Sequence, residues 1–170
     1  MTVGASGARE VGRARRGPGE GSSPLPVRSD APSGPRVLVV GTDDWAIEQS
    51  AAALEGSGMR VLRCHEPGEP AFPCNALVEG RTCPLEVGFD VVATVRARPL
   101  DTMAQGEIGV VCALRIGVPL VAAGVAPERP FGPWAAVTVD QGGDLAEACE
   151  KVADDAFAEL AAVPAPTGGA

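Results

Sequence analysis

Residues 36–56 read RVLVVGTDDWAIEQSAAALEG and carry the clearest folding signal in the chain. Their first six residues form a continuous apolar run that ends on a glycine, which is typical of a central parallel strand buried on both faces. Asp43 and Asp44 follow as candidate N-caps. A helix from Trp45 to about Gly56 is therefore predicted. Its apolar side contains Trp45, Ile47, Ala51 and Leu54.

Beyond this unit, apolar runs continue to alternate with helical patterns. The last helical pattern begins with Asp144 and Glu147, which resemble a capping box. Its apolar stripe contains Leu145, Ala148, Cys149, Val152, Ala156 and Leu160. The alternation predicts a three-layer α/β domain with a parallel five-stranded sheet and helices on both faces. The further strands are expected at 59–64, 89–95, 118–124 and 134–139, and the further helices within 103–116 and 144–160.

The two ends of the chain differ in composition from this domain. Residues 1–35 are rich in Gly, Ser, Pro and Arg and hold almost no large apolar side chain, so we expect a disordered tail. Residues 164–170, PAPTGGA, are expected to form a second short tail. Residues 36–163 remain as the folded domain.

The charge balance excludes several classes of function. The 170 residues include 14 basic and 22 acidic side chains, for a net charge of −8. Such a chain lacks the phosphate-neutralising surface of a nucleic-acid binder and suits an anionic membrane poorly. No apolar run approaches the ~20 residues of a membrane-spanning helix. The N-terminal arginines lead into GPGEGSSPLP rather than an apolar signal-peptide core, so we expect a cytoplasmic protein with reduced thiols.

The order of elements, with VLVVGTDDW, GFDVVATV and VPLVAAG, resembles the receiver domains of two-component signalling, which have the flavodoxin-like fold. The resemblance covers roughly 36–160 and implies a sheet with strand order 2-1-3-4-5. Asp43 and Asp44 match the acidic pair after the first strand. Val95 stands at the position of the phospho-accepting aspartate, and Gly124 replaces the Ser or Thr after strand 4. The resemblance therefore implies the fold without the phosphorelay chemistry.

The segment after the second predicted strand is the most unusual part of the chain. Through RCHEPGEPAFPCNAL, CPL and VPLVAAG the chain also resembles a group of uncharacterised actinobacterial proteins, which implies no particular activity. Cys64, His65, Cys74 and Cys83 lie within the aperiodic stretch 64–88, at the edge of the sheet where ligands bind in α/β folds. Three thiols and an imidazole can form a tetrahedral zinc site, and thiolates also suit an iron–sulfur cluster.

Other roles stay open for the cysteines. Cys112 lies at helical spacing from Ile108 and Val111, which favours the core, but it could also replace His65 as a fourth metal ligand. Cys149 falls in the apolar stripe of the last helix and is expected to be buried. The loop cysteines could also be inert, or they could form a redox disulfide.

A second group of polar residues is expected at the same edge of the sheet. Carboxylates with arginines nearby could hold a divalent cation or clamp an anionic ligand. A simpler interpretation is that an aspartate caps the first helix and pairs with Arg96. The candidate ligand-binding residues are Asp43, Asp44, Thr94, Arg96, Arg98 and Gly124.

Three functions are compatible with these residues. The first is a non-catalytic, receiver-like binding or sensory module whose cysteine-rich loop holds zinc or an iron–sulfur cluster. The second is a small redox or anionic-ligand enzyme that uses the Asp, Arg and Cys side chains at the sheet edge. The third is a structural subunit that works with an unidentified protein partner. The chain contains no dinucleotide-binding, P-loop or nucleophile-elbow motif, which favours the first function over an enzyme.

Overall fold

The computed structural model describes residues 34–162. The predicted tails lie outside this range, except for Gly34 and Pro35, and so does residue 163. The backbone N–H of Gly34 donates to the carbonyl of Gly58 (3.2 Å), and that of Arg60 donates to the carbonyl of Pro35 (3.1 Å). These backbone hydrogen bonds tie Gly34 and Pro35 to the start of the second strand.

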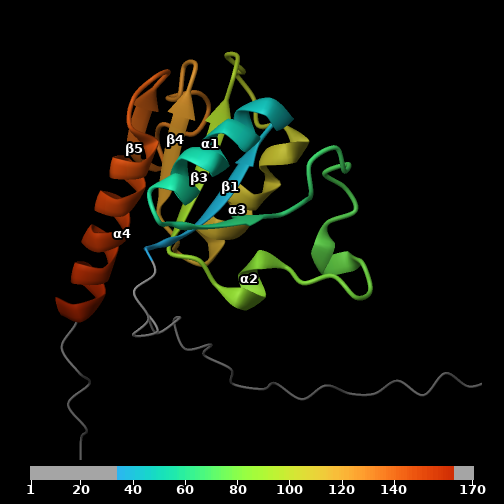
Figure 1. The fold of residues 1–170 in the computed structure, drawn as a ribbon, viewed down its shortest axis with the longest axis horizontal. Coiled ribbons are helices and arrows are strands. Elements are labelled where there is room, and N and C mark those ends of the chain that lie inside the picture. Colours follow the sequence, from blue (N-terminus) through green and yellow to red (C-terminus); the bar gives the residue numbers. More distant parts are fainter. Residues whose placement is uncertain (1–33, 163–170) are drawn as a thin grey trace, which may run out of the picture.

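The chain forms a three-layer α/β domain around a parallel sheet (Figure 1). All neighbouring strands are parallel, in the order β2-β1-β3-β4-β5. The predicted flavodoxin-like arrangement is confirmed. In chain order the elements are β1 (Arg36–Gly41), α1 (Asp44–Gly56), β2 (Arg60–Arg63), η1 (Asn75–Leu77), α2 (Pro84–Val87), β3 (Val91–Arg96), η2 (Gln105–Glu107), α3 (Ile108–Arg115), β4 (Leu120–Gly124), β5 (Ala135–Asp140) and α4 (Leu145–Ala162).

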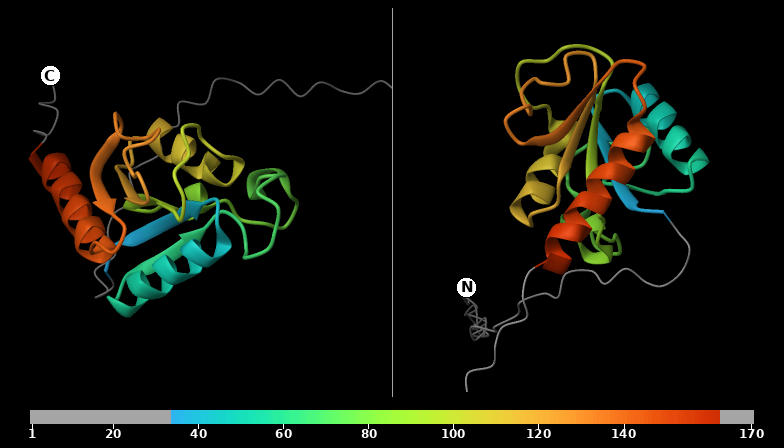
Figure 2. Two further views of the ribbon diagram at one scale, coloured as in Figure 1. Left: turned by 90° about the horizontal axis from the view of Figure 1, so that it is seen from above. Right: turned by 90° about the vertical axis from the view of Figure 1, so that its left-hand side faces the viewer.

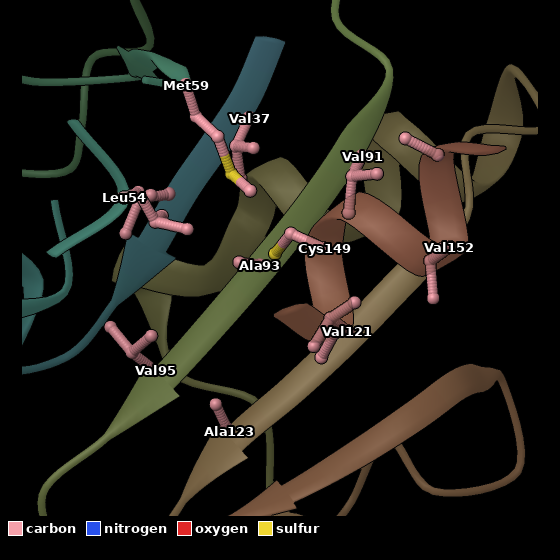
Figure 3. Packing of buried hydrophobic residues seen from close by; sticks show 13 residues of the cluster. Val37, Leu54, Met59, Val91, Ala93, Val95, Val121, Ala123, Cys149 and Val152 are labelled. Carbon is pink, nitrogen blue, oxygen red and sulfur yellow. The ribbon is translucent and has the colours of Figure 1, made fainter. Parts of the chain in front are cut away.

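Apolar side chains close the face of the sheet that carries α1 and α4 (Figure 3). Because side chains alternate between the two faces of a strand, Val37 and Val39 of β1 both point to this face. Leu54 of α1 and Cys149 and Val152 of α4 pack over them. All five side chains are buried. This layer contains no charged residue among the buried members of its cluster.

The short helix α3 covers the opposite face (Figure 2). Leu38 and Val40 alternate with the previous pair and belong to the same buried cluster as Val110 of α3. Phe89 and Phe131, which lie outside the helices and strands, complete the cluster. Loop residues therefore take part in covering this face.

Two apolar side chains do not lie where the sequence predicts. Trp45 is 68% exposed, because it lies two positions before Ile47 and so roughly 200° around α1 from the buried stripe. Leu160 is 53% exposed, because α4 continues past the beginning of the strands (Figures 1 and 2).

The predicted helix caps are only partly realised. Asp43 occupies the N-cap position of α1 but makes no side-chain capping bond. At α4, Asp144 Oδ1 accepts a hydrogen bond from the Glu147 N–H (3.0 Å), which is half of the predicted capping box. No helix within residues 34–162 is long and apolar enough to cross a membrane.

Candidate functional site

The end of β2 sends neighbouring side chains to opposite faces of the sheet. Arg63 is the last residue of β2, and its Nη2 lies 3.1 Å from Glu48 Oε1 on α1. Cys64 points the other way, toward α3, because successive side chains alternate. The cysteine-rich loop therefore leaves the sheet at a point that touches both helical layers.

Cys64 lies directly against α3. A Cβ added to Gly109 would come within 3.0 Å of the Cys64 Sγ, so the glycine makes room for the thiol. Cys112 follows one turn later on the same helix, and residues three apart share a helix face. The Asn75 side-chain amide donates to the Cys64 carbonyl and so holds the adjacent Cys74 close to the end of β2.

The thiols of Cys64 and Cys112 both have raised pKa values. Burial raises the pKa of Cys64 to about 12, and the neighbouring Cys74, Cys83 and Cys112 add to the rise. The pKa of Cys112 is raised by burial and by the charges of Cys74 and Cys83. We call Cys64, Cys74, Cys83 and Cys112 the thiol cluster. Its members come from the end of β2, two positions in the following loop, and α3.

All cysteines in the described part of the chain are free thiols. Within residues 34–162, no group of three or more His, Cys, Asp or Glu side chains is arranged to hold a metal ion. The thiol cluster therefore does not form a metal site in this structure. The expectation that Cys112 belongs to the core is wrong: it is half-buried, and Ile108 and Val111 beside it are 37% and 39% exposed.

Cys149 has a different environment. It is fully buried in the apolar cluster beneath α4, as the sequence predicts (Figure 3). Burial alone raises the pKa of this thiol to about 12. The sheet separates Cys149 from the thiol cluster.

A cavity of about 410 Å³ adjoins the ends of β1 and β2. Its wall includes Thr42 after β1, Glu48 of α1, and Arg63 and His65 on either side of Cys64. The predicted metal ligand His65 therefore lies in the cavity wall. Of the predicted ligand-binding residues, only Asp44 and Arg98 line this cavity.

Thr94 and Arg96 are buried in a different place, under η2. The Arg96 Nε and Nη2 each lie 2.6 Å from a carboxylate oxygen of Glu107, and the Thr94 hydroxyl donates to the same carboxylate (2.9 Å). Arg96 Nη1 also donates to the carbonyls of Leu100 and Arg129, both at 2.6 Å. The expected ion pair between Arg96 and Asp43 or Asp44 is therefore not the one that forms.

This buried ion pair has a structural role. The side chains of Arg96 and Glu107 are 1% and 0% exposed, and the Phe131 ring lies 5.2 Å from the Arg96 guanidinium carbon. Gly124, also predicted to bind a ligand, has a φ of +106° and lies against the Arg96 backbone, where a Cβ would overlap the carbonyl oxygen. The pair thus joins β3 to η2 and to the loops that follow β3 and β4, and leaves no donor of Arg96 for a ligand.

The remaining predicted site residues lie at the start of α1. The Asp44 Oδ2 accepts a hydrogen bond from the Gly68 N–H (3.1 Å), which ties the cysteine-rich loop to this helix. Asp43 lies at the N-cap position, outside the cavity wall. The sequence matches no model of a known protein family and no curated protein.

Proposed function

We propose that this protein is a non-catalytic, receiver-like binding or sensory module in which the thiol cluster holds zinc or an iron–sulfur cluster. One observation carries the proposal: cysteines from separate segments gather on one face of the sheet, while Cys149 lies on the other face. Cys74 and Cys83 come from the loop and Cys112 from α3, yet all three contribute to the raised pKa of Cys64.

The chemistry of the residues supports this choice. Thiolates are the ligands that zinc and iron–sulfur clusters prefer, and four of them complete a closed structural site. In this proposal Cys112 takes the fourth position, and His65 remains in the cavity wall. Binding requires the thiols to turn toward one centre and lose their protons, so ligand assembly and loop closure happen together.

The cysteine-rich loop is the part of the domain most able to make that movement. Between β2 and α2 its only regular structure is the short turn η1 (Figure 1). Its position rests on polar contacts such as Gly68 with Asp44 and Arg81 with Glu69. A bound metal ion would add strong metal–ligand bonds to these weak restraints. The module would then have two states, with a metal-free and a metal-bound loop. In the reducing cytoplasm, a protein partner could distinguish the two.

Phosphorylation is not part of the proposed function. Val95 stands where receivers carry their phospho-accepting aspartate, and it is buried against α1 and α4. A signal in this module would therefore come from metal binding by the cysteine-rich loop rather than from formation of an acyl phosphate. We accordingly propose no enzymatic activity.

Metal analysis of protein purified without oxygen tests the proposal. We expect about one zinc ion or one iron–sulfur cluster per chain, the latter visible by its absorption. The Cys74→Ser, Cys83→Ser and Cys112→Ser variants are each expected to lose the metal. Cys149→Ser is the matched control and should keep it, since this thiol lies across the sheet.

Measurements of folding and stability show whether a variant has lost only the metal site or the whole fold. Circular dichroism of each variant should show a folded domain, and added Zn²⁺ should raise the unfolding temperature of metal-free wild type but not of Cys83→Ser. Wild-type protein with far less than one equivalent of zinc or iron, and with no stabilisation by either, would refute the proposed function.

A further inference from the structure

Buried polar atoms without partners concentrate around one cavity. Within residues 34–162, the buried side-chain nitrogen and oxygen atoms that lack a hydrogen bond are Thr42 Oγ1, Glu48 Oε1, Arg63 Nε and His65 Nε2. All four belong to residues in the wall of the 410 Å³ cavity. The Glu48 Oε1 lies near Arg63 Nη2 as an ion pair, but not in hydrogen-bond geometry.

Such atoms are costly in a folded protein. A buried donor or acceptor without a partner destabilises the native state by about 1–3 kcal/mol, so native structures satisfy nearly all of them. All four side chains line one wall, so a ligand that enters the cavity and turns them toward it would supply the missing partners. The wall itself is firmly built, because Gly41 and Gly106 lie in such close contact that a Cβ on Gly106 would overlap the Gly41 carbonyl oxygen.

The charges of the wall argue against a phosphate-like ligand. Two arginines, Arg63 and Arg98, line the cavity, against four carboxylates. An anion with two negative charges would meet a wall of net negative charge. The acidic side chains are Asp44, Glu48, Glu66 and Glu69.

The composition of the wall offers little to a nucleobase or another flat ring. The described residues that line the cavity include no Phe and no Trp, and the imidazole of His65 is the one ring among them. Its apolar part is aliphatic, with Val39, Val40 and Ile47 among the lining residues. A volume of 410 Å³ lies within the range of small-ligand sites, about 300–1,000 Å³.

We propose that this cavity binds a small zwitterion of the amino acid class, with an ammonium and a carboxylate group on one skeleton. Arg63 Nε and the Thr42 hydroxyl donate to the ligand carboxylate. Glu48 Oε1 accepts from the ligand ammonium, and the aliphatic residues contact its carbon skeleton. A zwitterion satisfies acceptor and donor at once, and its zero net charge suits a wall that holds both signs. Of the thiol cluster, only Cys64 lines this cavity, and the proposed binding does not require a metal ion.

Isothermal titration calorimetry of the full chain with the common amino acids, inorganic phosphate and adenosine tests the proposal. At least one amino acid should bind at millimolar or lower concentration, while phosphate and adenosine should not. Glu48→Gln and Arg63→Met should each weaken binding at least about tenfold. Glu55→Gln on α1 and Arg60→Met on β2 are matched controls outside the wall and should leave binding unchanged.

A further variant guards against effects on folding. Thr42→Val removes a hydroxyl with little change in volume and should weaken binding while the unfolding temperature stays close to that of wild type. The proposal is wrong if no amino acid binds, if phosphate or adenosine binds more tightly than every amino acid, or if the two control variants lose binding as completely as Glu48→Gln and Arg63→Met.

Discussion

The two faces of the sheet are built in different ways. Under α1 and α4, the buried cluster is wholly apolar and its one cysteine, Cys149, is enclosed. Under α3, the buried residues include the Arg96–Glu107 ion pair, and the thiol cluster lies at the margin. The first face supplies stability through packing, whereas the second carries a buried ion pair and free thiols.

The lengths of the helices explain the difference. The helices on the apolar face have 13 and 18 residues, whereas α3 has 8. A short helix leaves part of a sheet for loops to cover, and loops carry backbone and side-chain polar groups that need partners. The Arg96 guanidinium meets this need by donating to the carbonyls of Leu100 and Arg129. Function in this molecule is therefore expected on the α3 face and at the ends of β1 and β2.

Breaking the buried ion pair should produce the largest loss of stability. Arg96→Met leaves the Glu107 carboxylate buried without a counter-charge and removes the donors to two loop carbonyls. We expect the free energy of unfolding to fall by about 3–5 kcal/mol, measured by urea denaturation. A pair on the other face, Lys151 with Asp155 on α4, is exposed, so Lys151→Met should lower the free energy of unfolding far less than Arg96→Met. Equal losses in the two variants would contradict the contrast between the faces.

A smaller loss is expected where the backbone of β1 meets η2. In Gly106→Ala the new Cβ overlaps the Gly41 carbonyl oxygen, so η2 must move away from the sheet. The expected cost is about 1–3 kcal/mol, with weaker ligand binding in the adjacent cavity. Gly56→Ala at the end of α1 adds a Cβ that meets open space, and it should be neutral or slightly stabilising. Urea denaturation compares the two, and a neutral Gly106→Ala would show that the contact is not tight.

Sequence reasoning predicts the apolar face well because its signals are local. The buried run of β1 and the stripe of α4 that contains Cys149 and Val152 are periodic patterns in contiguous residues. The parallel sheet and its strand order follow from the alternation of strands and helices and from the resemblance to receivers. Trp45 is the exception: its apolar character predicts the buried side of α1, but its angular position on the helix puts it on the exposed side.

The α3 face could not be predicted in the same way, because its contacts join distant residues. Arg96 and Glu107 are 11 positions apart, and only the tertiary structure shows that η2 lies over the end of β3. One local signal was available: Thr94 and Arg96 share the face of β3 that Val92 occupies, so both should have been expected to be buried. The close approach of Cys64 to Gly109 of α3 likewise appears only in the tertiary structure.

The buried Cys149 and the half-buried cysteines of the thiol cluster should differ in their reactivity toward thiol reagents. Once metal is removed by a chelator, the half-buried Cys112 and Cys74 should react with a thiol reagent in the native protein. Cys149 is fully buried and its pKa is about 12, so it should react only after the domain unfolds. Mass spectrometry of labelled peptides measures both rates. Cys149→Ala should lower the free energy of unfolding by about 1 kcal/mol, and native labelling of Cys149 as fast as that of Cys112 would contradict this assignment.

The smallest effect concerns the loop itself, through the ion pair between Glu69 and Arg81. The Arg81 guanidinium holds the pKa of the Glu69 carboxyl at about 2, against an ordinary 4.5, chiefly through their side-chain hydrogen bonds. Because the folded-state pKa is depressed, the pair stabilises the loop fully above about pH 4.5, and this contribution is lost as the pH falls toward 2. Carbon NMR titration of the Glu69 carboxyl should give the low pKa in wild type and a value close to 4.5 in Arg81→Gln. Both side chains are partly exposed, so global stability should change little, while hydrogen exchange in residues 65–83 should speed up in the variant. An ordinary pKa for Glu69 in wild type would mean that this contact does not hold the loop, and that its position depends on the remaining contacts to α1 and β2 alone.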